Sequence, residues 1–288
     1  MIGGLQGGKV RLVGDFEFTI AQTWALEAAS QPNITETTSL AAPTPWTYVR
    51  GRDVNTVQIF HYSTSLSYAR QSVVGQVKAD ATTGLVDVTD KNPVTNEKDF
   101  QIAATLNQAA VDVEYTFLLG VYALATSAAV AARSRGIVTA ATTNRINASS
   151  VALSKDLMNT LLRTMAANGA VFKNPVIFCG GYQRQRLSEI YGYAPQDRNV
   201  GGVAIKQIET EFAQLGVVWC PLITSTVLLV ADLAYCQPVF LPLDTRGVLF
   251  YEPLGKLGAA DGGHIYGQIG LDYGPEEFHG QIYGLTSS

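Results

Sequence analysis

The sequence predicts an α+β protein organised around one unusually long helix, and three stretches of the chain support this. In residues 96–136, apolar side chains recur at steps of three and four, the period of one helical face. Residues 54–95 are rich in β-branched side chains that alternate with polar ones, as in strands. Residues 150–242 combine amphipathic helical stretches with short apolar runs, which indicates a mixed α/β unit.

The long helix is predicted to run without a break from Asn96 to Gly136. Asn96 is a favourable N-cap and Gly136 a favourable stop. Such a helix is about 60 Å long, more than a compact domain needs, so we expect it to serve as a spine. Its expected buried face consists of Phe100, Ala103, Leu106, Ala110, Val113, Phe117, Val121 and Leu124.

A membrane-spanning helix is the alternative for part of this stretch. Residues 115–132 carry no charge, and about 18 mostly apolar residues can cross a bilayer. The segment is built on Ala, Thr, Ser and Tyr more than on Leu, Ile and Val, and no partner span accompanies it. These features favour a buried helix, with its Ala-rich half packed in a core or against neighbouring subunits.

Ahead of the helix, residues 1–54 are predicted to form an N-terminal arm, because their glycines and prolines prevent a long element. Residues 54–66 are expected to form a strand. Residues 71–95 are expected to form a two-stranded excursion that turns at Gly84 and returns just before the helix. Such a hairpin has too little core to be stable alone, so we expect it to lie on a neighbouring subunit.

Beyond the helix, residues 137–150 are expected to form a loop with a short strand, and helices and strands then alternate. The expected helices are 154–168 and 182–191, and the expected strands are 175–179, 203–208, 217–220 and 226–231. Residues 192–202 are expected to form a loop. The Gly- and Tyr-rich residues 247–285 are expected to be β structure.

The composition argues against several classes of protein. Hydrophobic residues make up 47% and charged residues only 15%, which indicates that much of the surface is covered by other chains. A net charge of −4 without a basic run argues against nucleic-acid binding by phosphate neutralisation. Cys179, Cys220 and Cys236 lack CxxC spacing and are expected to be reduced and buried. The N-terminal segment has no signal-peptide run, so we expect synthesis inside the cell.

No catalytic, cofactor-binding or metal-binding residue is predicted. Asp112 and Glu114, two apart on a helix, point to different sides and are interpreted as solvated or intersubunit charges. Gly180-Gly181 is interpreted as a tight strand-to-helix turn, because the Walker and GxGxxG patterns are absent. A phosphate held there with the help of Arg184 is the alternative.

The histidines and the acidic residues near the C-terminal strands do not predict a metal site either. His61, His264 and His279 lie far apart in the sequence, without metal-ligand spacing. Two glutamates at 276–277 lie close to His279 and Asp272, where a metal is conceivable. A polar turn between two strands is the favoured interpretation, because the cluster lacks ligand spacing.

Seven short motifs follow one another along residues 55–285. They are residues 55–60 (NTVQIF); Glu97, Phe100 and Gln101 followed by 112–114 (DVE); 133–137 (RSRGI); 209–217 (ETEFAQLGV); 227–232 (VLLVAD) with 239–242 (VFLP); 253–258 (PLGKLG); and 278–282 (FHGQI). In this order they resemble the major capsid proteins of tailed bacteriophages, which share the Johnson (Hong Kong 97-like) fold. Leu215 departs from the family's usual Phe-Gly step, and Leu241 stands where the family has Arg before Pro.

The resemblance implies an α+β, Hong Kong 97-like capsid fold in five parts. These are an N-terminal arm at 1–54, an E-loop at 55–95, a peripheral (P) domain with spine helix and following strand and loop at 96–149, an axial (A) domain at 150–242, and P-domain return strands with the C-terminus at 243–288. Some relatives join subunits through a Lys–Asn isopeptide bond. Lys78 lies in the excursion, but no pattern identifies a partner, so cross-linking is not predicted.

The function implied by the resemblance is that of a non-enzymatic major capsid protein of the virion. It would self-assemble as hexamers and pentamers into the icosahedral shell around the double-stranded DNA genome of a tailed phage. Expected partners are the portal protein and a separate scaffold or decoration protein, with weak, non-specific contact to DNA, no membrane and no cofactor. Synthesis in the host bacterial cytoplasm is expected. An encapsulin-type nanocompartment shell protein is the nearest alternative, followed by a phosphate-ligand-binding α/β enzyme.

Overall fold

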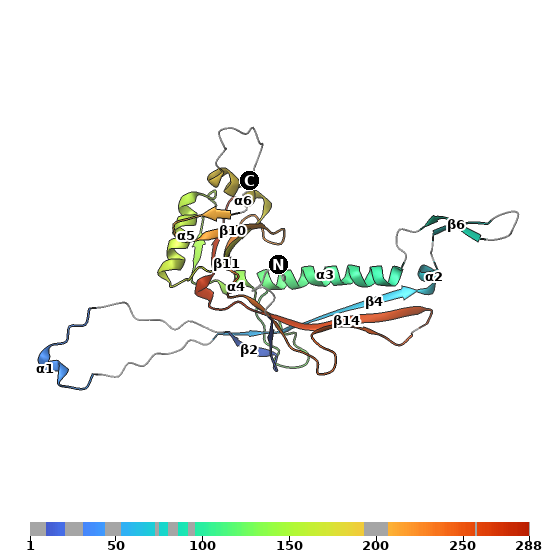
Figure 1. Ribbon diagram of the computed structural model, residues 1–288, viewed down its shortest axis with the longest axis horizontal. Coiled ribbons are helices and arrows are strands. Elements are labelled where there is room, and N and C mark those ends of the chain that lie inside the picture. Colours follow the sequence, from blue (N-terminus) through green and yellow to red (C-terminus); the bar gives the residue numbers. More distant parts are fainter. Residues whose placement is uncertain are drawn as a thin grey trace.

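The computed structural model describes residues 10–20, 31–43, 53–72, 75–79, 86–91, 96–192, 207–256 and 258–287, and all structural statements below concern them. The body contains two sheets, a long helix that lies along one of them, and two extensions that project from opposite ends (Figure 1).

The first sheet is built around one long strand. It consists of β1 (Arg11–Leu12), β12 (Gln237–Phe240), β14 (Ala260–Asp272), β13 (Leu249–Pro253) and β4 (Gln58–Ser67). Antiparallel β4 pairs with β14 from Gln58–Ile269 to Ser67–Ala260, which confirms the strand expected from the alternation in residues 54–66. The chain breaks the predicted strand at Val57, so that β3 (Asp53–Thr56) belongs to a separate pair.

The second sheet forms the mixed α/β unit. Its order is β7 (Arg145–Asn147), β15 (Gly280–Tyr283), β11 (Leu228–Asp232), β8 (Pro175–Cys179), β10 (Gln214–Trp219) and β9 (Gln207–Glu209). Helices α5 (Lys155–Ala167) and α6 (Gly181–Tyr191) accompany this sheet in Figure 1. Leu161, Leu162 and Met165 of α5 are fully buried with strand residues in one apolar cluster. The predicted helix at 154–168 is confirmed, with Ser154 as its N-cap.

The long helix, α3 (Glu97–Leu119), is shorter than predicted and only partly buried. It lies along β4 and β14 (Figure 1), with Val113 and Phe117 almost completely buried in the main core. Phe100 and Leu106, expected on the buried face, are instead 50% and 40% exposed. The apolar period therefore continues beyond the part of the helix that the subunit itself covers.

The prediction of an unbroken helix to Gly136 is wrong, because the chain turns back at Gly120. A Cβ atom on Gly120 would overlap the carbonyl oxygens of Thr116 and Ser134, at 2.5 Å for Thr116. Gly136 N–H donates to the Gly120 carbonyl at 2.9 Å, and Ala123 bridges Arg133. Residues 121–133 consequently form a loop rather than helix, and α4 (Ile137–Ala140) follows it.

Two excursions leave this body. Strand β2 (Glu17–Ile20) pairs with β3, and α1 (Glu36–Ser39), which lies between them in the sequence, is placed well away from the body (Figure 1). At the other end, α2 (Tyr68–Gln71) leads to the predicted hairpin, with β5 (Gly75–Ala79) antiparallel to β6 (Val86–Lys91). Its expected turn at Gly84 and the loop predicted at 192–202 fall mostly or wholly outside the described residues.

A polar cluster fastens the base of the first excursion to the body. Arg135 donates to Asp53 Oδ2 at 3.1 Å and to the Tyr273 hydroxyl at 3.1 Å, and that hydroxyl donates to Asp53 at 2.6 Å. Burial and the neighbouring Asp53 raise the pKa of Tyr273 above its ordinary value, which keeps the phenol protonated. The point at which the excursion leaves the sheet is therefore held by side chains from three separate parts of the chain.

Candidate assembly surfaces

Asp112 and Glu114, the two acidic residues near the C-terminal end of α3, lie in different environments. Asp112 accepts hydrogen bonds from the Tyr62 hydroxyl at 2.7 Å and from Gln108 Nε2 at 2.8 Å. Burial and the bond to Asp112 raise the pKa of Tyr62, so the phenol remains the donor. Asp112 thus joins the helix to β4, while Glu114 lies half-buried two residues further on.

At the turn, Gly180 is closely packed, whereas Gly181 lines a hollow of about 550 Å³ together with Arg184. A Cβ atom on Gly180 would lie 3.0 Å from the Ile223 carbonyl oxygen and 3.2 Å from Ser225. Arg184 donates to the Val217 carbonyl at 2.6 Å, which directs its guanidinium to the end of β10. Close packing against Ile223 and Ser225 accounts for the glycine at position 180, and the strand-to-helix turn expected from the sequence is present between β8 and α6.

His279 is part of the core. Its Nδ1 accepts from the Asp232 backbone N–H at 3.2 Å, and its Nε2 donates to the Tyr273 carbonyl at 2.6 Å. Complete burial lowers the pKa of His279, so the ring is neutral. His61 and His264, distant in the sequence, meet across β4 and β14 with ring centroids 5.1 Å apart.

Glu276 and Asp272, two of the acidic residues near the C-terminal strands, accept hydrogen bonds from the protein, whereas the buried Glu277 Oε2 has no hydrogen-bond partner among the described residues. Glu276 accepts from the backbone N–H groups of Thr142 and Thr143 at 2.8 and 3.1 Å. Asp272 pairs with Arg11 at 2.6 Å and accepts from Gly274 N–H at 3.0 Å. Within the described ranges, no group of three or more His, Cys, Asp or Glu side chains is placed to hold a metal ion.

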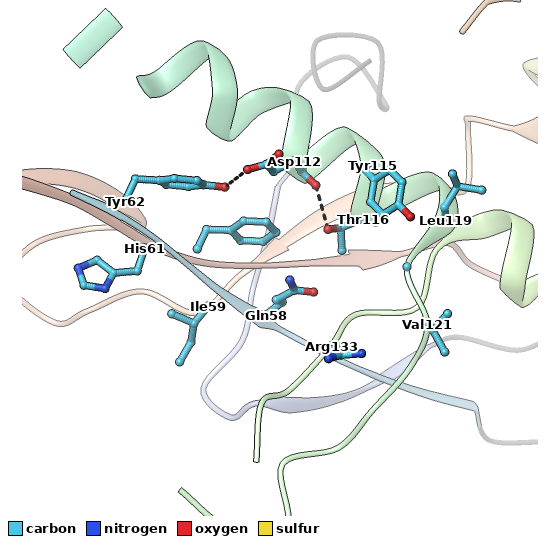
Figure 2. Close-up of a pocket in the computed structure, with 12 residues that line it drawn as sticks. Gln58, Ile59, His61, Tyr62, Asp112, Tyr115, Thr116, Leu119, Val121 and Arg133 are labelled. Carbon is cyan, nitrogen blue, oxygen red and sulfur yellow. Dashed lines mark hydrogen bonds between the residues drawn. The ribbon is translucent and has the colours of Figure 1, made fainter. Parts of the chain in front are cut away.

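A hollow lies between the C-terminal half of α3 and the start of β4, and we call it the α3–β4 groove (Figure 2). Its volume is about 510 Å³. Gln58, Tyr62 and Asp112 provide polar walls, and Tyr115 and Val121 are 53% and 65% exposed. The remaining lining residues are Ile59, Phe60, His61, Thr116, Leu119, Gly120 and Arg133.

A second hollow of about 730 Å³ adjoins the groove, since Gln58, Ile59 and Arg133 line both. It is bounded by Phe16 and by the loop at 125–133, which is rich in alanine. Ile59 is 48% exposed there. Large apolar side chains that gather around a hollow are typical of a surface that another protein covers.

The comparison with known protein families identifies the family of the chain that carries this surface. The model of the SU10 major capsid protein family matches residues 4–286. The chain belongs to this family. It is a phage shell protein, located in the capsid of the virion, and capsid assembly implies that it associates with copies of itself. The family is one of structural capsid proteins. A search of curated proteins found no match.

Solved structures confirm the Hong Kong 97-like α+β fold of this capsid protein. The cyanophage A-1(L) capsid is similar with a TM-score of 0.65 at 12% identity, over 99% of this chain and 92% of that chain. The structure of Microbacterium phage Oxtober96 is similar with a TM-score of 0.57 at 12% identity, over 96% of this chain and 88% of that chain. The SrpI encapsulin of Synechococcus elongatus PCC 7942 is similar with a TM-score of 0.57 at 7% identity, over 96% of this chain and 85% of that chain. At these identities the likeness shows the fold alone.

The α3–β4 groove is the feature of the capsid protein that the sequence interpretation missed. Val121 and the alanines at 125–132 were assigned to a buried helix, whereas they line an exposed loop beside the groove. A signal was present in Gly120, which interrupts an otherwise favourable helical stretch. Among the described residues, no helix is long and apolar enough to cross a membrane.

Proposed function

We propose that this capsid protein assembles as hexamers and pentamers of a closed icosahedral shell around the double-stranded DNA of a tailed phage. The family match over residues 4–286 is the observation that carries the proposal. The exposure of residues 31–43 supports it, because Ile34 and Leu40 are 68% and 85% exposed, and large aliphatic side chains are rarely left uncovered in a working assembly.

We assign the parts of this shell subunit as the resemblance implies: the arm at 1–54, the E-loop at 55–95, the P-domain at 96–149 and 243–288, and the A-domain at 150–242. In this assignment the β5–β6 hairpin is the tip of the E-loop, and α3 is the P-domain spine. The hairpin is too small to be stable by itself, so its place is on a neighbouring subunit.

Partners beyond the capsid protein itself follow from the same role. A portal protein at one vertex and a separate scaffold or decoration protein are the proposed protein partners. Packaged DNA would be contacted weakly and without sequence preference, because a chain with net charge −4 does not release many counterions from DNA.

Electron microscopy of the purified protein, alone and with its scaffold partner, tests the proposal. Closed icosahedral shells or rings of five and six subunits are the expected result. A monodisperse monomer at high concentration under both conditions would contradict it. Light scattering across a concentration series gives the same answer in solution, since shell formation has a sharp onset with protein concentration.

An encapsulin-type nanocompartment is the second candidate, because the fold is also similar to the SrpI encapsulin. The contents of particles purified from the natural source separate the two functions. A shell filled with double-stranded DNA and joined to a portal supports the phage capsid. A shell filled with one enzyme and carrying no portal would support the compartment instead.

A further inference from the structure

One charged side chain of the α3–β4 groove has no partner within the described part of the chain. Arg133 lines both hollows, and its guanidinium makes no ion pair and no hydrogen bond with a described residue. Figure 2 shows it among the side chains that line the pocket. The nearby acidic wall is already occupied, since Asp112 accepts from Tyr62 and Gln108. The groove therefore offers an apolar surface with one available cation.

The excursion between β2 and β3 presents matching chemistry. Every residue from 31 to 43 is exposed, and Ile34 and Leu40 flank α1. Glu36, in the first turn, forms no ion pair with a described residue. A four-residue helix is far below the length at which helices are stable in water, so α1 needs a surface to pack on.

The position of α1 directs it to another copy of the chain. Its two limbs start from paired residues, Ile20 and Asp53, and α1 lies near the middle of the excursion. Limbs of roughly 15 residues each reach up to about 50 Å when extended. In Figure 1, α1 lies on the opposite side of the body from the far end of α3 and the β5–β6 hairpin. A neighbouring subunit in the proposed shell would be the surface that α1 can reach.

We propose that residues 31–43 of one subunit dock into the α3–β4 groove of a second copy, where the Glu36 carboxylate pairs with Arg133 and the aliphatic side chains of Ile34 and Leu40 cover Ile59 and Val121. This inference rests on the proposed shell function and names the surface on which the arm packs. Burial of both partners removes the exposure of the aliphatic side chains and gives each unpaired charge an opposite one.

Another apolar patch of the described surface, at the end of β10, fits this segment less well. Trp219 is 60% exposed and Val218 44% exposed at the end of β10. The basic residue there, Arg184, already donates to the Val217 carbonyl, so it is directed away from an incoming carboxylate. The groove combines apolar surface with an available cation, whereas this patch does not.

Charge reversal and charge exchange test the proposed pair. We expect Arg133→Glu and Glu36→Arg each to raise the protein concentration needed for half-maximal shell formation by at least about tenfold, because like charges then meet in a covered groove. The double variant should return to within about threefold of the wild type, since the exchanged pair is again complementary. Arg163→Glu, an exposed change on α5, is the matched control and should have no effect. Thermal unfolding of unassembled subunits verifies that each variant folds.

Mixing of two cysteine variants tests whether residues 31–43 of one copy dock on another copy. Leu40→Cys subunits and Val121→Cys subunits, mixed before assembly and oxidised, should yield a disulfide-linked pair containing one of each. Leu40→Cys mixed with Val171→Cys, which is exposed on another part of the body, should yield none. The native cysteines Cys179, Cys220 and Cys236 are buried and do not compete.

Different results would contradict the proposed shell function and the proposed docking of residues 31–43. If the wild type forms no shells or rings, the proposed function is wrong. If it forms shells while both charge reversals behave like Arg163→Glu, or no mixed disulfide appears, the docking is wrong and the shell function stands. A disulfide that forms only within a single chain carrying both cysteines would also overturn the docking between copies.

Discussion

Replacement of Gly120 by Ala separates two accounts of why α3 ends where it does. If the apolar period decided the matter and the helix continued, alanine would stabilise the chain by about 1 kcal/mol, because alanine has the higher helix propensity. In the structure the opposite sign follows. The new Cβ atom meets the carbonyl oxygens of Thr116 and Ser134, which belong to the backbone and cannot rotate away.

The expected change in the free energy of unfolding depends on the backbone groups that the new methyl group displaces. Overpacking of a well-packed site costs about 1–3 kcal/mol. The Gly120 carbonyl also accepts from Gly136 N–H at 2.9 Å and from the Thr139 hydroxyl at 2.5 Å, and displacement weakens bonds worth about 1 kcal/mol each. We expect Gly120→Ala to lower the free energy of unfolding by about 3 kcal/mol.

Urea unfolding of unassembled subunits, followed by far-ultraviolet circular dichroism, measures this change as a shift of midpoint at constant slope. Gly255→Ala is the matched control, because no atom lies within 4 Å of its added Cβ. That variant should be neutral or more stable by up to about 1 kcal/mol, as the unfolded chain loses freedom. An increase in stability of Gly120→Ala would refute the explanation of the helix end.

Three further predictions concern the same subunit. Phe117→Ala should lower the free energy of unfolding by about 3–5 kcal/mol, whereas Phe100→Ala on the exposed part of the same helix should lower it by less than about 1 kcal/mol. Ala125→Glu and Ala129→Glu should change subunit unfolding by less than about 0.5 kcal/mol and weaken assembly, because the loop that carries them is exposed and lines a hollow. The stability of the subunit should fall as the pH drops below about 6.5, because burial lowers the pKa of His279 and the unfolded state takes up the proton first.

Each of these has a clear contradicting result. Equal destabilisation by both phenylalanine variants would mean that the outer part of α3 is packed in the isolated subunit. Normal shells with both glutamates in the loop would show that this loop faces solvent in the assembly. For His279, the unfolding midpoint is measured from pH 8 to pH 5, and a flat profile below the ordinary histidine pKa would mean that the ring is not held neutral.

Local signals in the sequence were sufficient for elements that the subunit completes by itself. Ser154 and Gly169 bracket α5 as N-cap and as a residue with positive φ after its end, and both were recognisable. The run at β11 is buried along its whole length, as its continuous apolar character indicated. In these cases the chemistry that sets the element lies within a few residues of it.

The errors have a different physical origin. The end of α3 is decided by the backbone of Ser134, which approaches Gly120 only after the chain has folded back. The exposure of Phe100 could not be inferred, because an apolar period is the same whether the covering surface belongs to this chain or to another. The groove was missed for the same reason, since Arg133 and Ile59 come together only through tertiary structure.

The pairing of β4 with β14 also has a consequence for when a subunit becomes able to assemble. Thr64 and Gly263, hydrogen-bonded across this pair, are 199 residues apart in the chain. During synthesis β4 therefore waits without a partner strand until most of the polypeptide has left the ribosome, because synthesis proceeds from the N-terminus. One wall of the α3–β4 groove is formed by β4, so incomplete chains lack a finished docking surface. Under the proposed docking, unfinished copies on one polysome would therefore lack the surface on which a neighbour's arm packs.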